Sequence, residues 1–258
     1  MAPQPDQAGL QEYAILHADA VARTPSAVSK DQAVALPVNI VTSWLALFGP
    51  TGLGFTSPLD TPSESVSSNA DKTLIILGAG ASVGKFAVQL ASLAGIRKII
   101  VVAGAGSKDT LLAMGATHFV DRNAGPSEIV KQVHGLTGGG QGVTHVYHSH
   151  GFDYALDIAL LPADTPSSLQ SVHPIDDEEG QKLTSARPQC KTVMLEVANE
   201  ALAPRVREFW EMVPKWLVEG KVKAGSLRVV EGLEKVEDIN GALDGYREGT
   251  GVQVIVHP

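Results

Sequence analysis

The residues with the clearest chemistry lie between Gly78 and Gly84, where a short apolar run passes into a glycine-rich turn and then an amphipathic segment. Small residues let a backbone approach a phosphate closely, and the unpaired N–H groups at a helix start attract the anion. We therefore expect the pyrophosphate of a dinucleotide to bind at Gly80, Ala81, Ser82 and Val83.

This turn departs from the G-x-G-x-x-G pattern of dinucleotide-binding folds. Counted back from Gly84, the first two glycine positions hold Ala79 and Ala81, while Gly78 and Gly80 fall one place out of register. A tight strand-to-helix connection that binds no ligand is therefore the alternative interpretation.

The choice of nucleotide is expected to depend on Ser107 and Lys108, which follow a predicted strand at 98–102. A carboxylate at this place would bind the ribose 2′-hydroxyl of NAD, whereas a hydroxyl and an amine suit the 2′-phosphate of NADP. The sequence thus favours NADPH. Asp109 would reverse this preference if its side chain turned inward, and a solvated helix start is the alternative interpretation.

Three histidines lie close together at His145, His148 and His150. On a strand, the first two point to opposite faces, and no cysteine or acidic residue close in sequence completes a familiar metal site. We expect no metal, zinc included. His148, Ser149 and His150 are candidate cleft residues at the end of a predicted strand over 144–148, and solvent-exposed strand-end histidines are the alternative.

The elements that must position these residues alternate from Thr73 onward between short apolar runs and amphipathic segments. This alternation predicts an α/β fold with a doubly wound, Rossmann-like parallel sheet and helices on both faces. Further helices are expected over 29–36, 38–48, 204–218 and 236–247, with strands over 191–197 and 252–256. Flexible loops are expected at about 49–70 and 162–189, which are rich in polar residues, glycine and proline.

Composition favours a globular protein that acts on a small molecule. Of 258 residues, 44% are hydrophobic and 19% are charged, and the net charge is −8. An acidic chain without basic clusters is not expected to bind nucleic acid or an anionic membrane. Cys190 is the single cysteine, which predicts no internal disulfide and favours a reducing, cytoplasmic setting. No long apolar run or secretory leader pattern is apparent, so a soluble protein is expected.

Several segments, in their order, resemble the medium-chain dehydrogenase/reductase superfamily. The resemblance is to its zinc-independent enoyl and quinone reductases, including the trans-acting enoyl reductases of fungal polyketide pathways. The matching segments are 9–14, 35–48, 79–93, 111–121, 217–223 and the stretch from Gly232 onward. The resemblance implies an N-terminally shortened member, with 1–24 and 226–258 as a reduced remnant of the barrel-like catalytic domain and 25–225 as the dinucleotide-binding domain.

The resemblance also implies an activity. The expected reaction is NADPH-dependent reduction of an activated C=C bond, in an enone or enoyl thioester of secondary metabolism. Asn39 and Thr42 would face the nicotinamide and the substrate, although Asn39 is equally suited to capping its helix. A polyketide synthase is a candidate partner, and the protein would be a monomer or a homodimer.

Two other functions remain open at this point. The first is a non-redox enzyme, such as a cyclase or isomerase acting on a biosynthetic intermediate, that reuses a truncated reductase fold. The second is a catalytically silent binding protein. The altered glycine turn and the polar strand end with its histidines favour the first of these.

Overall fold

The computed structural model describes residues 15, 18, 21–60, 68–151, 153–194, 203–225, 227–232, 234–247 and 253–257. Within them, a six-stranded parallel sheet has the order β3-β2-β1-β4-β5-β6, and β7 and β8 form a separate parallel pair. The strands are β1 (Thr73–Leu77), β2 (Lys98–Ala103), β3 (His118–Asp121), β4 (His145–His148), β5 (Ser167–Ser171), β6 (Cys190–Met194), β7 (Leu227–Glu231) and β8 (Gln253–His257).

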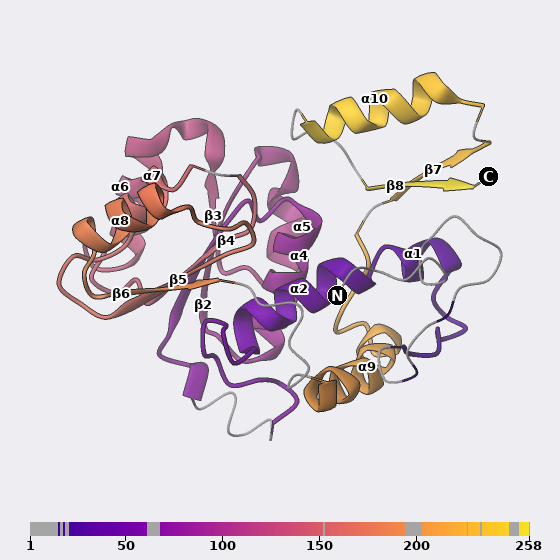
Figure 1. The fold of residues 1–258 in the computed structure, drawn as a ribbon, viewed down its shortest axis with the longest axis horizontal. Helices are drawn as coiled ribbons and strands as arrows, with labels where there is room; N and C mark the ends of the chain where they lie inside the picture. Colours follow the sequence, from indigo (N-terminus) through magenta and orange to yellow (C-terminus); the bar gives the residue numbers. More distant parts are fainter. Residues whose placement is uncertain are drawn as a thin grey trace.

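Helices cover both faces of the large sheet (Figure 1). The helices are α1 (Lys30–Val34), α2 (Pro37–Phe48), α4 (Ser82–Leu93), α5 (Lys108–Ala113), α6 (Pro126–Leu136), α7 (Ala155–Leu160), α8 (Asp177–Ala186), α9 (Ala203–Val218) and α10 (Val236–Arg247), with 3-10 turns η3 (Ala105–Ser107) and η4 (Arg122–Ala124). No helix in the described ranges is long and apolar enough to cross a membrane.

Two hydrophobic cores lie on opposite faces of this sheet. Every residue of β1 is buried, because a central parallel strand is covered on both sides. One core joins Leu74 and Ile76 to apolar residues of α2, α4, α5 and α9, and the other joins Ile75 and Leu77 to those of α6, α7 and α8. The predicted doubly wound, Rossmann-like fold is therefore confirmed.

Helix α4 is held from behind by α2 and by the segment after α9. The Ser43 hydroxyl of α2 donates to the Val83 carbonyl at 2.7 Å. The Gln89 side chain accepts from Lys223 N at 2.7 Å and donates to the carbonyl of the same residue at 3.2 Å. These bonds fix the helix that follows the glycine turn.

The prediction of a flexible loop over 162–189 is wrong. This stretch contains strand β5 and helix α8. Strand β5 is polar but lies inside the sheet, and Ser167, Gln170 and Ser171 are buried there. Helix α8 is equally polar and buries only Leu183. Neither element shows the apolar periodicity by which buried segments are recognised.

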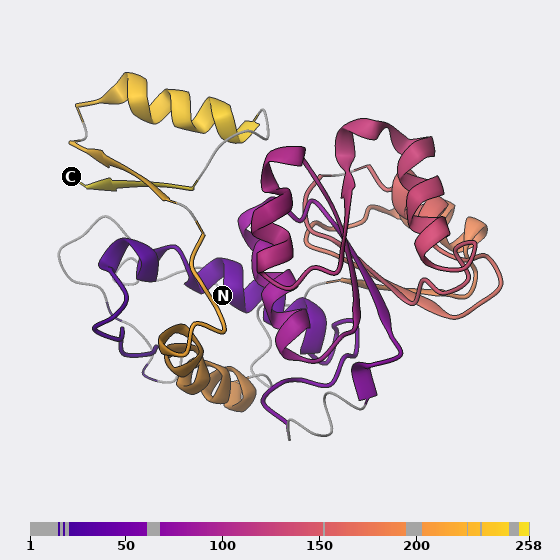
Figure 2. The ribbon, with the colours of Figure 1, turned by 180° about the vertical axis from the view of Figure 1, so that it is seen from behind.

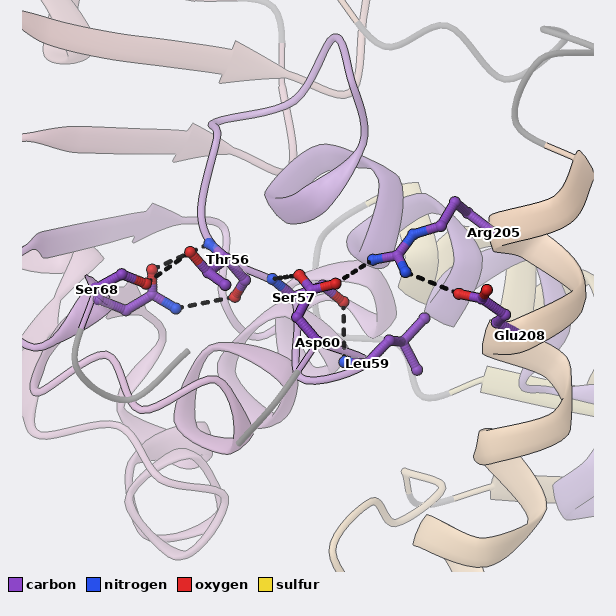
Figure 3. Close-up of polar contacts among 8 residues, drawn as sticks. Thr56, Ser57, Leu59, Asp60, Ser68, Arg205 and Glu208 are labelled. Carbon is purple, nitrogen blue, oxygen red and sulfur yellow. Dashed lines mark hydrogen bonds and ion pairs between the residues drawn. The ribbon is translucent and has the colours of Figure 1, made fainter. Parts of the chain in front are cut away.

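The predicted loop at about 49–70 is described in two parts. Residues 51–60 form no regular helix or strand, but they are anchored, because Leu53 and Phe55 are buried. The buried Asn69 side chain donates to the carbonyls of Thr56 and Ala94, each at 2.9 Å. Arg205 of α9 pairs with Asp60 at 2.9 Å, so that the loop is bonded to a distant helix (Figure 3).

The C-terminal elements β7, β8 and α10 form a small unit beside the large sheet rather than within it (Figures 1 and 2). His257 of β8 contacts Asp31 of α1 at 2.7 Å and Glu231 of β7 at 3.0 Å. The segment 9–14, which resembles the family, lies outside the described residues, as does Val252 of the strand predicted over 252–256.

Candidate functional site

Strand order reverses between β1 and β4, which lie next to each other at the centre of the sheet. Leu77, the last residue of β1, pairs in register with His148, the last residue of β4. In open α/β sheets, ligands bind outside the carboxyl ends of strands at such a reversal point. The sequence-predicted residues from the glycine turn and from the end of β4 therefore meet at one edge.

The glycine turn is built by Gly78 and Gly84. Gly78 has a φ of 75°, and a Cβ there would lie 2.6 Å from the His150 Cβ. A Cβ on Gly84 would lie 2.6 Å from the Ala79 Cα, so this glycine lets α4 pack against the end of β1. Gly78 is one place out of register with the G-x-G-x-x-G pattern. A glycine is nevertheless required there, because His150 leaves no room for a side chain.

The start of α4 fits a phosphate group. Its N-cap, Ala81, is extended and provides no side-chain hydrogen bond, so the first N–H groups of the helix are not capped by that residue. A Cβ on Gly80 would lie 3.2 Å from the Ser107 hydroxyl oxygen and would narrow the path to the start of α4. Because Gly80 has no side chain, a phosphate group can approach the helix start along this path. Ser82 also lies here, 3.5 Å from the side-chain oxygen of Gln253 in β8.

The ends of β2 and β3 bring hydroxyl and basic groups together. Ser107 ends the turn η3 after β2, and Lys108 begins α5 as an exposed residue. The Nε atom of Arg122 lies 3.7 Å from the position that a Cβ on Gly104 would take. The nearby carboxylate of Asp121 accepts from Asn123 N at 3.0 Å and caps η4. Hydroxyl and guanidinium groups are of the kinds that bind phosphate oxygens.

The three candidate residues at the end of β4 have different environments. The Ser149 hydroxyl donates to the Leu77 carbonyl at 2.7 Å and ties β4 to β1. His150 is exposed beside Gly78. His148 is 4% exposed, and its Nδ1 lies 2.8 Å from the Oδ2 of Asp157, which is wholly buried in α7.

The buried pair of His148 and Asp157 is electrostatically coupled. Burial alone would lower the pKa of His148, but the hydrogen bond and charge of Asp157 outweigh it, so the pKa lies above its usual value. Burial raises the pKa of Asp157, and the imidazole opposes that shift. The pair therefore holds a proton at neutral pH more firmly than a free histidine does.

The candidates in α2 contribute less to this edge. The Asn39 side chain donates to the Ala35 carbonyl at 3.0 Å and does not cap the helix, whose N-cap is Leu36. Thr42 is 7% exposed within the same helix. No described contact joins either side chain to the end of β4, so their predicted role at the nicotinamide stays a prediction.

Sequence reasoning missed three residues at this edge: Asp157, Arg122 and Gln253. Asp157 is separated from its partner by a turn and part of a helix, and Gln253 arrives from the far end of the chain. Arg122 had a usable signal, because it directly follows a strand that ends beside β2. Grouping the residues that follow each strand would have found it.

Strand order, glycine turn and helix start together define a protein with the doubly wound fold that is typical of dinucleotide-binding proteins. The zinc-binding dehydrogenase family matches residues 82–174. A probable mitochondrial zinc-binding oxidoreductase of Arthroderma benhamiae is 31% identical over 113 residues, which cover 44% of this chain and 32% of that protein. The trans-enoyl reductase himH of Aspergillus japonicus is 31% identical over 123 residues, which cover 47% of this chain and 33% of that protein.

Among solved structures, the CurK enoyl reductase superposes with a TM-score of 0.68 at 20% identity, over 90% of this chain and 64% of that one. The chain is thus similar to medium-chain dehydrogenase/reductase proteins, among them enoyl reductases. Its alignments span about a third of the length of the curated relatives, 32% and 33% in the two cases above. Despite the family's name, the described residues contain no group of three His, Cys, Asp or Glu side chains suited to a metal ion.

Proposed function

We propose that the protein is an NADPH-dependent reductase of an activated C=C bond, in an enone or an enoyl thioester of secondary metabolism. The observation that carries this proposal is the uncapped start of α4 behind the Gly78 turn, at the reversal point between β1 and β4. The likeness to trans-enoyl reductases supports the choice of a C=C bond.

NADPH, when bound, supplies the hydride. The residues expected to hold it are Gly80 to Val83 at the pyrophosphate, with Ser107, Lys108 and Arg122 at the 2′-phosphate. Ser149 keeps β4 and β1 in register beneath the nucleotide. The protein's contribution is to orient the two reactants and exclude water. We also propose that the reaction takes place in the cytoplasm and that a polyketide synthase presents the thioester.

The proposal is tested by titrating the protein with NADPH and with NADH while following nicotinamide fluorescence. NADPH should bind more tightly. Lys108→Glu and Arg122→Glu should each weaken NADPH binding by about tenfold or more, because a charge-assisted hydrogen bond is lost and a like charge is introduced. NADH binding should change less.

Lys191→Glu is the matched control, since it makes the same charge change on β6, at the other side of the sheet. An NADPH preference that survives both test variants would contradict the assigned 2′-phosphate site. If neither nucleotide binds, the reductase proposal is wrong, and the non-redox enzyme becomes the stronger candidate.

A further inference from the structure

His148 and Asp157 form a pair that nucleotide binding leaves unused. Their side chains are 5% and 0% exposed, and Nδ1 lies 2.8 Å from Oδ2. The Tyr154 ring packs against the imidazole at a centroid distance of 4.7 Å, and its hydroxyl shares a hydrogen bond with that of Ser171 at 2.8 Å. The imidazole is therefore held in one orientation, with Nδ1 committed to the carboxylate.

The other ring nitrogen lacks a partner. The Nε2 of His148 is buried and makes no hydrogen bond with the described residues. Burying a polar atom without a partner is costly, so such an atom in a folded protein calls for a ligand or a water. The Nδ1 bond leaves Nε2 as the only ring nitrogen available to one.

Space is open beside this nitrogen. Gly151 has a φ of 105°, and a Cβ on it would lie 3.6 Å from Nε2, with no other atom outside its chain neighbours within 4 Å. The missing side chain of Gly151 thus leaves a gap at van der Waals distance from the imidazole. Its position, three residues past the end of β4, is at the same edge as the glycine turn.

We propose that His148, oriented by Asp157, is the proton donor of this site and that its Nε2–H binds the carbonyl oxygen of the substrate. This inference rests on the proposed reductase function. A carbonyl oxygen gains negative charge as hydride adds to the β-carbon, and a fixed, charged donor stabilises it most at that moment.

The step balances as follows. The hydride that a bound NADPH would supply, with the electron pair of its C–H bond, forms a C–H bond at the β-carbon, and the electron pair of the C=C bond moves into the enolate. The Nε2–H bond then breaks, its proton forms a C–H bond at the α-carbon and so restores the carbonyl group, and the electron pair of the N–H bond stays on the imidazole. Oxidation of NADPH supplies both electrons, and solvent returns the proton to His148.

The charges around His148 favour its protonated form. Burial lowers the pKa of His148, but the hydrogen bond and charge of Asp157, the backbone of Gly151 and the charge of Asp153 raise it and together outweigh burial. Two other histidines interact electrostatically in this region, His150 after β4 and His173 after β5. The pKa of His173 is lowered by burial and by the charges of His148 and His150. The acid form of His148 should therefore act at neutral pH and be lost as the pH rises through its raised pKa.

The direct test is an NMR titration of protein labelled with ¹⁵N in histidine, in which His148→Gln identifies the Nε2 signal. The probe is the butanoyl thioester of N-acetylcysteamine, which has the carbonyl oxygen but no reducible bond. The probe should shift the Nε2 signal, alone and with NADPH present. Asp157→Asn should lower the pH midpoint of His148, while His118→Gln, at the amino end of β3, should change neither result.

Kinetics with the trans-2-butenoyl thioester give the second readout. His148→Gln should lower kcat by about 10²-fold or more while leaving the NADPH affinity unchanged, as expected for loss of a general acid. In D₂O, the wild-type protein should label one face of the α-carbon, and the variant should label both. If His148→Gln does not fold, Asp157→Asn carries the test through its pH profile, whose alkaline limb should move to lower pH.

The inference is overturned if the probe leaves the Nε2 signal unmoved with and without NADPH, or if His148→Gln keeps the wild-type kcat and labelling pattern. An unmoved pH profile in Asp157→Asn overturns the role of the pair. If NADPH does not bind but the probe still shifts Nε2, the reductase function is wrong while His148 stands as the ligand for the carbonyl oxygen.

Discussion

His145 shows how burial decides the charge of a single residue in this fold. Its ring packs against Phe55 at a centroid distance of 4.3 Å, and Lys72 lies 5.3 Å from the centre of the same phenyl ring. Burial, followed by the charge of Lys72, lowers the pKa of His145 to about 4. The folded protein therefore holds this histidine neutral at pH values where an unfolded chain protonates it.

The sign of the pH dependence follows from that shift. Above the pKa of about 6.5 that a histidine has in the unfolded chain, His145 is neutral in both the folded and the unfolded state. It then makes no pH-dependent contribution to the free energy of unfolding. As the pH falls towards 4, the unfolded chain binds a proton that the folded chain does not, so the free energy of unfolding decreases. Between pH 7 and pH 5, this residue should account for a loss of about 2 kcal/mol.

Urea unfolding of the wild type and His145→Gln at both pH values measures the effect. The variant should lose less stability between pH 7 and pH 5 than the wild type does. His118→Gln is the control, because His118 lies half-exposed at the start of β3. Equal losses in the wild type and in His145→Gln would show that His145 does not carry this part of the acid sensitivity.

Periodicity predicted that His145 and His148 point to opposite faces, and the structure confirms it: the first lies against Phe55, and the second against Tyr154. What strand periodicity could not supply was Asp157, the partner of His148. That contact depends on how α7 folds back against β4, which is a tertiary event without a local signature.

At the scale of elements, the join between β1 and α4 depends on close contact between two backbones. Gly84 lies against the turn, and a Cβ on it would come within 2.6 Å of the Ala79 Cα and 2.7 Å of the Gly78 carbonyl oxygen. Both obstacles are backbone atoms, so they cannot move aside as a flexible side chain would. The helix itself would have to shift.

Gly84→Ala should therefore destabilise the protein, by about 1–3 kcal/mol as for other overpacked sites, despite the better helix propensity of alanine. It should also weaken NADPH binding, because the start of α4 moves. Gly180→Ala in α8 is the matched control: a Cβ there meets nothing within 4 Å, so the same substitution should be neutral or stabilising by up to about 1 kcal/mol. Thermal unfolding and the NADPH titration measure both effects, and a Gly84→Ala protein as stable as the wild type would contradict the packing argument.

The elements also show where sequence patterns fail. Apolar strands such as Thr73–Leu77 were predicted correctly because both of their faces are buried. Strand β5 was missed because polar residues are buried on both of its faces, Ser167 on one and Gln170 on the other. A strand between two others gains its stability from backbone pairing on both edges, and that contribution is not visible in side-chain hydropathy.

At the scale of the whole molecule, the edge of the sheet that carries the glycine turn rests on a hydrophobic core. That core reaches α9, which is far from the glycine turn in sequence. Phe209 of α9 is fully buried and contacts Trp44 of α2 at a ring distance of 5.1 Å. Helix α2 in turn bonds to Val83 at the start of α4 through Ser43. The position of the glycine turn therefore depends on how α9 packs against α2, which in turn holds the start of α4.

Helix α9 also carries a polar link one turn earlier. Arg205 pairs with Asp60 at 2.9 Å and with Glu208 at 2.8 Å (Figure 3). These groups are 37% to 54% exposed, so solvent screens them. Exposed ion pairs contribute about 0–1 kcal/mol, whereas removing a buried aromatic ring costs about 3–5 kcal/mol.

Phe209→Ala and Arg205→Ala therefore separate the two ways in which α9 is attached. Phe209→Ala should lower the free energy of unfolding in urea by about 3–5 kcal/mol and should also weaken NADPH binding, because α2 no longer holds the start of α4 in place. Arg205→Ala should cost less than about 1 kcal/mol and leave NADPH binding unchanged. If Arg205→Ala costs as much as Phe209→Ala, the loop contact rather than the core fixes α9. If Phe209→Ala binds NADPH as tightly as the wild type, the glycine turn keeps its shape without the support of α2 and α9.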